Sequence, residues 1–321
     1  MNFLHTLFLA LALAVLPVAA QAQAFPNKPV KVIVTFPPGG TPDIYGRVLS
    51  QELSNLWKQP VVVENKAGAS GTIGTDFVAK AAPDGYTLLF AADASITIAP
   101  LLYSRNPYDP VKDLAPIVNA AAGPFVILAN SSFPANNVKE LIALAKSQPG
   151  KISYASSGAG GQQHLTMETI KSMGDIDMLH IPYKGFGQGV TDVLANQVPL
   201  IVGGITASIG LTQSGKLKAL GITGTKRSSF FPGVATVSET LPGFDITAWY
   251  GFLAPAGTPR EIISKINDDV VAIIKRPEFQ ARLARDAIDP VANTPEQFAA
   301  QIKTDIAMWS KIVKASGAKL E

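Results

Sequence analysis

The chain has 321 residues, a net charge of +3 and no cysteine. This length suits two α/β lobes better than one small domain, and 47% hydrophobic against 16% charged residues is enough for a sizeable core. The lack of cysteine excludes disulfides, thiolate metal sites and cysteine nucleophiles, and the interspersed charges exclude the basic block that nucleic-acid binding needs.

The first 24 residues have the pattern of a secretory signal peptide. Residues 3–20 are nearly all apolar, and an Ala-Gln-Ala pattern of small residues at signal-peptidase sites occurs at 20–22 and again at 22–24. Polar, proline-containing sequence follows, which favours cleavage after Ala22 or Ala24 over the alternative of an uncleaved anchor. We therefore expect an exported protein whose mature form is soluble.

In the first third of the mature chain, β-branched strands alternate with amphipathic helices. The predicted strands are 30–36, 61–65 and 86–91. One helix begins at Thr41, with proline at its first position, and a second follows the glycine-rich segment 68–74. This alternation predicts a parallel sheet with right-handed crossovers.

A second series of elements begins near residue 125. The predicted strands and helices of this series are, in order, 125–129, 138–147 (helix), 151–155, 162–173 (helix), 190–195 (helix), 198–202 and 217–223. After a turn-rich stretch, a strand at 248–254 precedes two long amphipathic helices, 260–274 and 294–316. These helices have no sheet of their own, so they must cover the first one, and the chain must cross between lobes twice.

The sequence therefore predicts an α/β, two-lobed fold like that of periplasmic binding proteins (the Venus flytrap), with two crossovers between the lobes. We expect lobe 1 to comprise residues 25–123 and 230–321, and lobe 2 to comprise residues 124–229.

Four glycine-rich loops each follow a predicted strand, at 39–40, 68–74, 158–161 and 203–204, and three of them open onto a predicted helix. In parallel α/β sheets ligands bind beyond the carboxyl ends of the strands. Glycine lets the backbone approach a ligand closely, and free N–H groups at a helix start attract anions. These loops predict a carboxylate site that needs no arginine or lysine. Tight strand-to-helix turns are the alternative explanation of the same glycines.

Several hydroxyl groups lie in or beside these loops and could donate to a carboxylate. They belong to Thr41, Ser70, Ser95, Ser157 and Thr206. Helix capping is the alternative role, above all for Thr41. Asp43 complements the dipole of its helix, or it holds loop amides beside the bound anion.

Two histidines and several aromatic residues leave their roles open. His164 has Glu168 four residues further on, the spacing of a surface helix pair, and the spacing of His164 and His180 makes a poor metal site. Trp249 and Tyr250 either line the cleft or pack in the core, and Phe36, Phe186 and Trp249 together indicate room for an apolar or ring-bearing ligand.

Enzyme motifs are missing from the sequence. Residues 68–71 have the wrong spacing for a G-x-S-x-G elbow, no P-loop occurs, and Gln163 stands where a dinucleotide fingerprint needs its third glycine. We therefore predict a protein that is not an enzyme and uses no cofactor or metal. A hydrolase is the remaining enzyme alternative.

Several segments form a specific set in their order and spacing. They are Pro37-Pro38-Gly39-Gly40-Thr41-Pro42-Asp43 with Arg47, residues 61–71, Pro83-Asp84-Gly85-Tyr86-Thr87-Leu88, Tyr154 to Gly158, Gln163-His164-Leu165, residues 180–185, residues 249–252 and residues 254–259. The set resembles the substrate-binding proteins of tripartite tricarboxylate transporters, also called the Bordetella uptake gene (Bug) family, over essentially the whole mature chain.

The resemblance implies a periplasmic solute-binding protein that captures a small carboxylate and delivers it to integral-membrane transporter subunits. It implies that backbone amides, hydroxyls and waters hold the carboxylate. The protein is expected to be a monomer and not to bind nucleic acid. A periplasmic sensor that docks on a receptor is the alternative. The predicted ligand-binding residues are Gly39, Gly40, Thr41, Asp43, Ser70, Gly71, Ser95, Ser157, Gly160, Gly161, Tyr183, Gly204 and Thr206.

Overall fold

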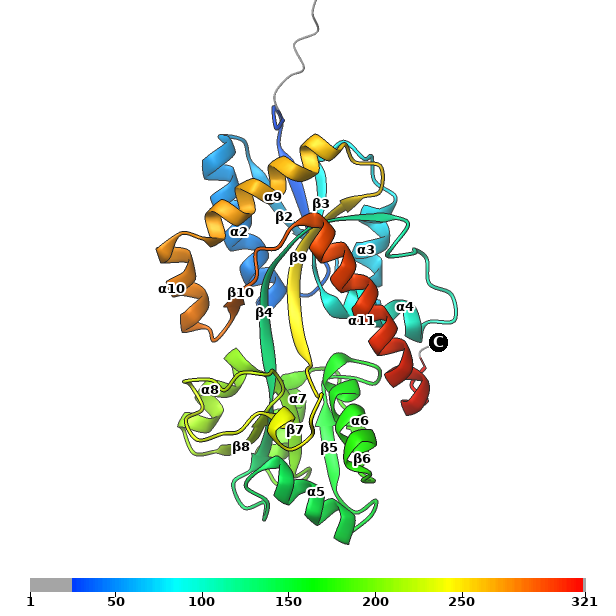
Figure 1. Ribbon diagram of the computed structural model, residues 1–321, viewed down its shortest axis with the longest axis vertical. Helices are drawn as coiled ribbons and strands as arrows, with labels where there is room; N and C mark the ends of the chain where they lie inside the picture. The colour runs from blue at the N-terminus through cyan, green and yellow to red at the C-terminus, as the bar shows by residue number, and fades with distance from the viewer. Residues whose placement is uncertain (1–24, 320–321) are drawn as a thin grey trace, which may run out of the picture.

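One long strand, β4 (Leu114–Asn130), joins two α/β lobes in the computed structural model, which describes residues 25–319 (Figure 1). Its residues 114–124 pair with β9 (Thr247–Pro255), and its residues 125–129 pair with β7 (Leu200–Gly204) of the other lobe. The chain enters lobe 2 along β4 and returns to lobe 1 at β9. The predicted signal peptide, 1–24, lies outside the described residues.

The sheet of lobe 1 has the order β2-β1-β3-β9-β4, with the short β10 (Asp289–Pro290) paired to β4. Strands β1 (Val30–Val34), β2 (Val61–Asn65) and β3 (Thr87–Ala92) are parallel, whereas β9 is antiparallel to both neighbours. The three predicted strands are parallel, as expected, and the sheet becomes mixed through β9, one of the two strands that connect the lobes.

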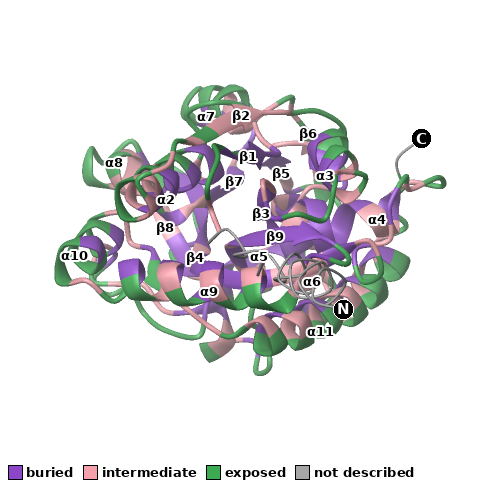
Figure 2. Ribbon diagram, turned by 90° about the horizontal axis from the view of Figure 1, so that it is seen from above, coloured by how far each residue is buried: buried purple, intermediate pink, exposed green. Residues whose placement is uncertain are grey.

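Alternating side chains of this sheet bury two opposite faces. Val32 and Phe90 pack in a cluster with α2 (Thr41–Trp57), α9 (Arg260–Ile274) and α10 (Pro277–Arg285). Ile33 and Leu89 pack in another cluster with α3 (Thr72–Ala79) and α11 (Pro295–Ser316). Figure 2 shows the buried strands enclosed by helices whose outer surfaces are exposed.

The sheet of lobe 2 has the order β8-β4-β7-β5-β6. Its further strands are β5 (Ser153–Ser156), β6 (Leu179–Pro182) and β8 (Leu217–Ile222). Its helices are α5 (Val138–Ser147), α6 (Gln162–Gly174), α7 (Phe186–Leu194) and α8 (Ile205–Gln213). The remaining helical turns are η1 (Ala69–Gly71), η2 (Ala94–Ile98), α4 (Ala99–Leu102) and η3 (Val237–Glu239).

The predicted two-lobed α/β fold is confirmed, and several elements differ from those expected. β4 is much longer than the predicted strand 125–129, because the alanine-rich stretch before it has little β-propensity and is held by pairing with β9. Neither α10 nor α8 was predicted from the sequence; in α8, β-branched residues and glycine weaken the helical pattern. Within the described residues, no helix is both long and apolar enough to cross a membrane.

The lobe boundaries stay a prediction, and the packing suggests one refinement. Val237, Leu241 and Phe244 lie in the same hydrophobic cluster as Leu141 and Leu220 of lobe 2. We therefore propose that lobe 2 extends to about residue 246, where β9 begins, instead of ending at residue 229.

The last helix, α11, contacts both lobes. It packs against β4 and η2 and also against α6 of lobe 2 (Figure 1). Its Trp309 and Val313 belong to a hydrophobic cluster formed mainly by lobe 2, whereas Phe298 and Ile302 belong to a cluster of lobe 1. The helix thus covers the first sheet, as expected, and in addition links the lobes.

Candidate ligand-binding cleft

A cleft of about 650 Å³ lies between the two lobes and is lined by both of them. Lobe 1 contributes the loops that follow β1, β2 and β3, and lobe 2 contributes those that follow β5, β6 and β7. The crossover strands contribute Pro124 and Tyr250. This volume is within the usual range for small-molecule sites.

Besides α3, whose N-cap is Gly71 and whose first N–H is bonded to the Ala69 carbonyl, four helices begin at this cleft with a glycine as N-cap. The N-cap residues are Gly40 of α2, Gly161 of α6, Gly185 of α7 and Gly204 of α8, and all four line the cleft. No side chain caps any of these helix starts. Their first backbone N–H groups therefore remain available to a ligand, and the helix dipoles favour negative charge there. The fourth glycine loop, 203–204, thus also opens onto a helix, which the sequence did not predict.

Asp43 fixes the loop after β1 in place. Its Oδ2 accepts a hydrogen bond from the Gly39 amide (3.0 Å), and its Oδ1 accepts bonds from Arg47 Nε (2.9 Å) and Asn65 Nδ2 (2.8 Å). Burial opposes ionisation, but the bonds from Arg47, Gly39 and Asn65 outweigh it and lower the pKa of Asp43. Of the two predicted roles, the structure gives Asp43 the one of holding a loop amide.

We expect Asp43→Ala to destabilise the protein and weaken ligand binding. The variant leaves the Gly39 amide and the Asn65 amide without their acceptor, which costs about 1–3 kcal/mol. Urea unfolding and a ligand titration measure the two effects. Glu278→Ala is the control, because Glu278 also lies in a first helical turn but is exposed. Equal effects of the two substitutions would contradict the assigned role.

Two stacked histidines support the glycine loop of lobe 2. The rings of His164 and His180 lie 3.8 Å apart between centroids. His164 Nδ1 accepts a hydrogen bond from the Gly160 amide (3.0 Å), and His180 Nε2 lies 2.6 Å from Ser156 Oγ, which contacts the backbone of Gly158. The predicted pair of His164 with Glu168 is present at 3.8 Å, but His164 is buried and Glu168 is partly buried, so the pair does not lie on the open surface.

We predict that the two buried histidines make the folded protein less stable in acid. Burial lowers the pKa of His164, and burial together with His164 lowers that of His180 to about 4. Below the unfolded-state value near 6.5 the unfolded chain binds more protons, so stability present at neutral pH falls as the pH drops toward 4. Asp93 and Asp305 act in the opposite direction, because burial raises their pKa values.

The variant His180→Phe isolates the histidine contribution. The phenylalanine ring can keep the stacking against His164, but it cannot be protonated. We expect its unfolding free energy to fall less than that of the wild type between neutral pH and pH 5, as measured by urea unfolding. An identical pH dependence would show that His180 does not contribute.

Most of the predicted ligand-binding residues line the cleft. These are Gly40, Thr41, Ser70, Gly71, Ser157, Gly161, Gly204 and Thr206. The others are not among the residues that line it. Gly39 and Asp43 bind each other, Gly160 binds His164, Ser95 Oγ donates to the Ala92 carbonyl, and Tyr183 donates to Asp192. That any of these residues contacts a ligand stays a prediction.

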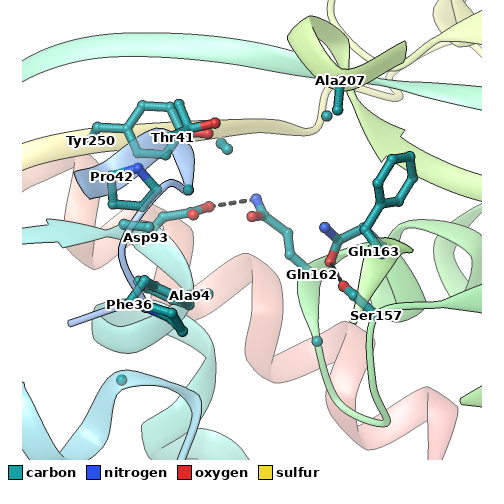
Figure 3. A pocket seen from close by; sticks show the side chains of 18 of the residues that line it. Phe36, Thr41, Pro42, Asp93, Ala94, Ser157, Gln162, Gln163, Ala207 and Tyr250 are labelled. Atoms are coloured by element: carbon teal, nitrogen blue, oxygen red, sulfur yellow. Dashed lines mark hydrogen bonds between the residues drawn. The ribbon is translucent and has the colours of Figure 1, made fainter. Parts of the chain in front are cut away.

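Strand alternation separates the two aromatic residues of β9. Tyr250 lines the cleft and faces Thr41 (Figure 3). Trp249 is buried on the opposite face, where its Nε1 donates to Asp305 Oδ2 (2.9 Å) and its ring packs edge-on against Phe298. Trp249 therefore takes the core alternative, while Phe36 and Phe186 line the cleft as expected.

A pair of polar residues in the cleft wall was not predicted from the sequence. Asp93 follows β3, Gln162 opens α6, and the Nε2 of Gln162 donates to Asp93 Oδ2 at 2.5 Å across the two lobes (Figure 3). The available signal was that Asp93 comes directly after a predicted strand, where ligands bind. Ser95, two residues further on, was predicted instead. Within residues 25–319, no three His, Asp or Glu side chains are placed to hold a metal ion.

Comparison with known proteins points to one family. Residues 45–318 match the model of the tripartite tricarboxylate transporter family receptor, TctC. Protein BugT of Bordetella pertussis is 36% identical, over 98% of this chain and 97% of BugT. The solved structure of R. palustris Rpa4515 with adipate is 30% identical to this chain, with a TM-score of 0.83. The match covers 92% of this chain and 100% of Rpa4515.

A second solved structure has a different ligand. MatC (Rpa3494) from Rhodopseudomonas palustris with bound malate is 29% identical, with a TM-score of 0.78. The match covers 90% of this chain and 100% of MatC. Both structures are solved with a small dicarboxylate.

Proposed function

The chain belongs to the TctC family of tripartite tricarboxylate transporter receptors, and on this premise we propose that it is a periplasmic protein that captures a small carboxylate for a membrane transporter. Members of this family are solute-binding proteins, not enzymes. The single observation that carries the proposal is the meeting of four uncapped, glycine-started helix N-termini in one interlobe cleft. Such termini bind an anion through backbone N–H groups without a paired cation.

The lining of the cleft suits a carboxylate with an apolar body. Lys184 is the only lysine or arginine among the described residues that line it, and it is exposed. Phe36, Phe125 and Tyr250 supply aromatic surface. Adipate and malate in the two solved relatives support a carboxylate as the ligand class. The N-terminal pattern of residues 1–24 supports export to the periplasm, where we expect the protein to act as a monomer.

Contacts between the lobes support a hinged mechanism of capture. Gln162 of lobe 2 binds Asp93 of lobe 1, and Thr206 Oγ1 donates to the Asp286 carbonyl at 2.5 Å. These contacts form only when the lobes approach each other. We propose that a bound carboxylate favours this arrangement, that the closed form delivers the ligand to integral-membrane transporter subunits, and that the lobes separate on release.

A thermal-shift panel tests the proposed function. The purified mature protein is heated with mono-, di- and tricarboxylates, amino acids and aromatic acids, and each acid is compared with its uncharged primary amide. A ligand at 100 times its dissociation constant stabilises the fold by about 2.7 kcal/mol. We expect a clear shift with one class of acid and none with the matching neutral compound. No shift with any acid would contradict the proposal.

A further inference from the structure

The carboxyl group of Asp93 lies in the cleft wall without a cation to balance it. The residue is 2% exposed and follows the carboxyl end of β3. It forms no ion pair with any lysine or arginine of residues 25–319, and the charged group that acts on it is another acid, Asp305 on α11. The phenol of Tyr250 on β9 faces it as well. An uncompensated acid is therefore built into a cleft that otherwise favours anions.

One oxygen of Asp93 is bonded to lobe 2 and the other has no partner. Oδ2 accepts from the amide of Gln162, which is itself 5% exposed. Oδ1 is buried without a hydrogen-bond partner. A buried carboxyl oxygen in this situation costs free energy unless a donor reaches it. The group that already binds Oδ2 is a primary amide, so the site accepts a nitrogen donor in its present geometry.

A second unpartnered polar atom lies on the neighbouring strand. Thr35 follows β1, is fully buried, lines the cleft, and its Oγ1 has no hydrogen-bond partner. β1 pairs in parallel with β3, with Ile33 opposite Leu89. Thr35 and Asp93 come directly after the carboxyl ends of these neighbouring strands, and both line the cleft. Two neighbouring polar groups of lobe 1 thus lack partners at the same part of the cleft.

We propose that Asp93 determines which carboxylates the cleft accepts: it selects a ligand whose second end carries an amide or ammonium group and discriminates against a second carboxylate. The inference rests on the proposed function, in which helix N-termini hold the first carboxylate. A nitrogen donor satisfies Asp93 and replaces or joins the Gln162 amide. A second carboxylate would meet this buried acid with no cation between them, so it could bind only if Asp93 held a proton, whereas an ammonium group stabilises the ionised form of Asp93.

A matched ligand series tests this specificity. Succinate, glutarate and adipate are each compared with their monoamide and with the ω-amino acid of the same chain length, by calorimetric titration of the mature protein at neutral pH. For the best-fitting length we expect the wild type to bind a nitrogen-bearing ligand about tenfold or more tightly than the diacid. Asp93→Asn removes the acid but keeps the shape, so we expect the preference to disappear and the diacid to bind more tightly than in the wild type.

Asp305→Asn is the matched control. Asp305 is a second, partly buried acid beside the same strands, but it does not line the cleft and its replacement leaves Asp93 in place, so the variant is expected to keep the preference. A wild type that binds the diacid as tightly as the amide would overturn the inference and leave the proposed function intact. If no compound of the series bound, the proposed function would fail and the inference with it. The wild-type comparison decides the question even if Asp93→Asn does not fold.

Discussion

Gly71→Ala is expected to destabilise lobe 1 and to abolish ligand binding. Gly71 lines the cleft and caps α3 with φ +90°, a left-handed conformation that favours glycine. A Cβ there would lie 2.6 Å from the Cβ of Ser95 and 3.2 Å from that of Thr35. Both neighbours are 0% exposed, so neither can move aside without disturbing the core.

Two costs add in this variant. The backbone strain costs about 1–3 kcal/mol. The overpacking costs about 1–3 kcal/mol more, and it displaces the loop that forms one wall of the cleft. Urea unfolding measures the stability, and calorimetric titration measures the loss of binding.

Gly204→Ala is the matched control for Gly71→Ala. Gly204 is also an N-cap that lines the cleft, but its φ is −60° and a Cβ there would meet no atom within 4 Å. We expect its stability to stay within about 0.5 kcal/mol of the wild type. If Gly71→Ala unfolded at the same urea concentration as this control, the close packing of the loop against Ser95 and Thr35 would be refuted.

Trp309→Ala is expected to have the second large effect. The side chain is 1% exposed and belongs to a hydrophobic cluster formed mainly by lobe 2 together with Ile98 and Leu102 of lobe 1, and its helix α11 also covers the sheet of lobe 1. Removing a buried tryptophan costs about 3–5 kcal/mol. Because Trp309 links α11 to lobe 2, the loss should also let the lobes separate more widely in the absence of ligand.

Two measurements check this prediction. Urea unfolding gives the stability, and small-angle scattering of the ligand-free protein gives the radius of gyration, which should increase. Ser310→Ala, at the exposed next position of the same helix, should change neither. A variant Trp309→Ala with unchanged scattering would show that α11 does not restrain the lobes.

The position of the cleft was predictable from the sequence because it depends on local patterns. Each glycine-rich loop comes directly after a β-branched run, and alternation of strands and helices brings such loops together at one edge of a sheet. Gly40, Gly71, Gly161 and Gly204 were therefore predicted and do line the cleft. The helix at 260–274 was also predicted with its observed bounds, from apolar residues at helical spacing.

The contacts between lobes were not predictable in the same way. Asp93 and Gln162 are 69 residues apart and lie on different lobes, so their bond depends on how the lobes are oriented. The strand β3 ends at Ala92 and η2 begins at Ala94. The exact position of this change decides which side chain faces the cleft: Asp93 lines it, whereas Ser95 is fully buried. The choice between Trp249 and Tyr250 likewise depends on the register of β9.

The central claim is that backbone amides at helix N-termini in the cleft hold a carboxylate. Amide chemical shifts of the isotope-labelled mature protein, recorded during titration with the acid that gives the largest thermal shift, test it most directly. We expect the largest downfield changes at the first amides of α2, α6 and α8, around Gly40, Gly161 and Gly204, and none with the matching neutral amide of that acid. Changes confined to residues outside the cleft would contradict the claim.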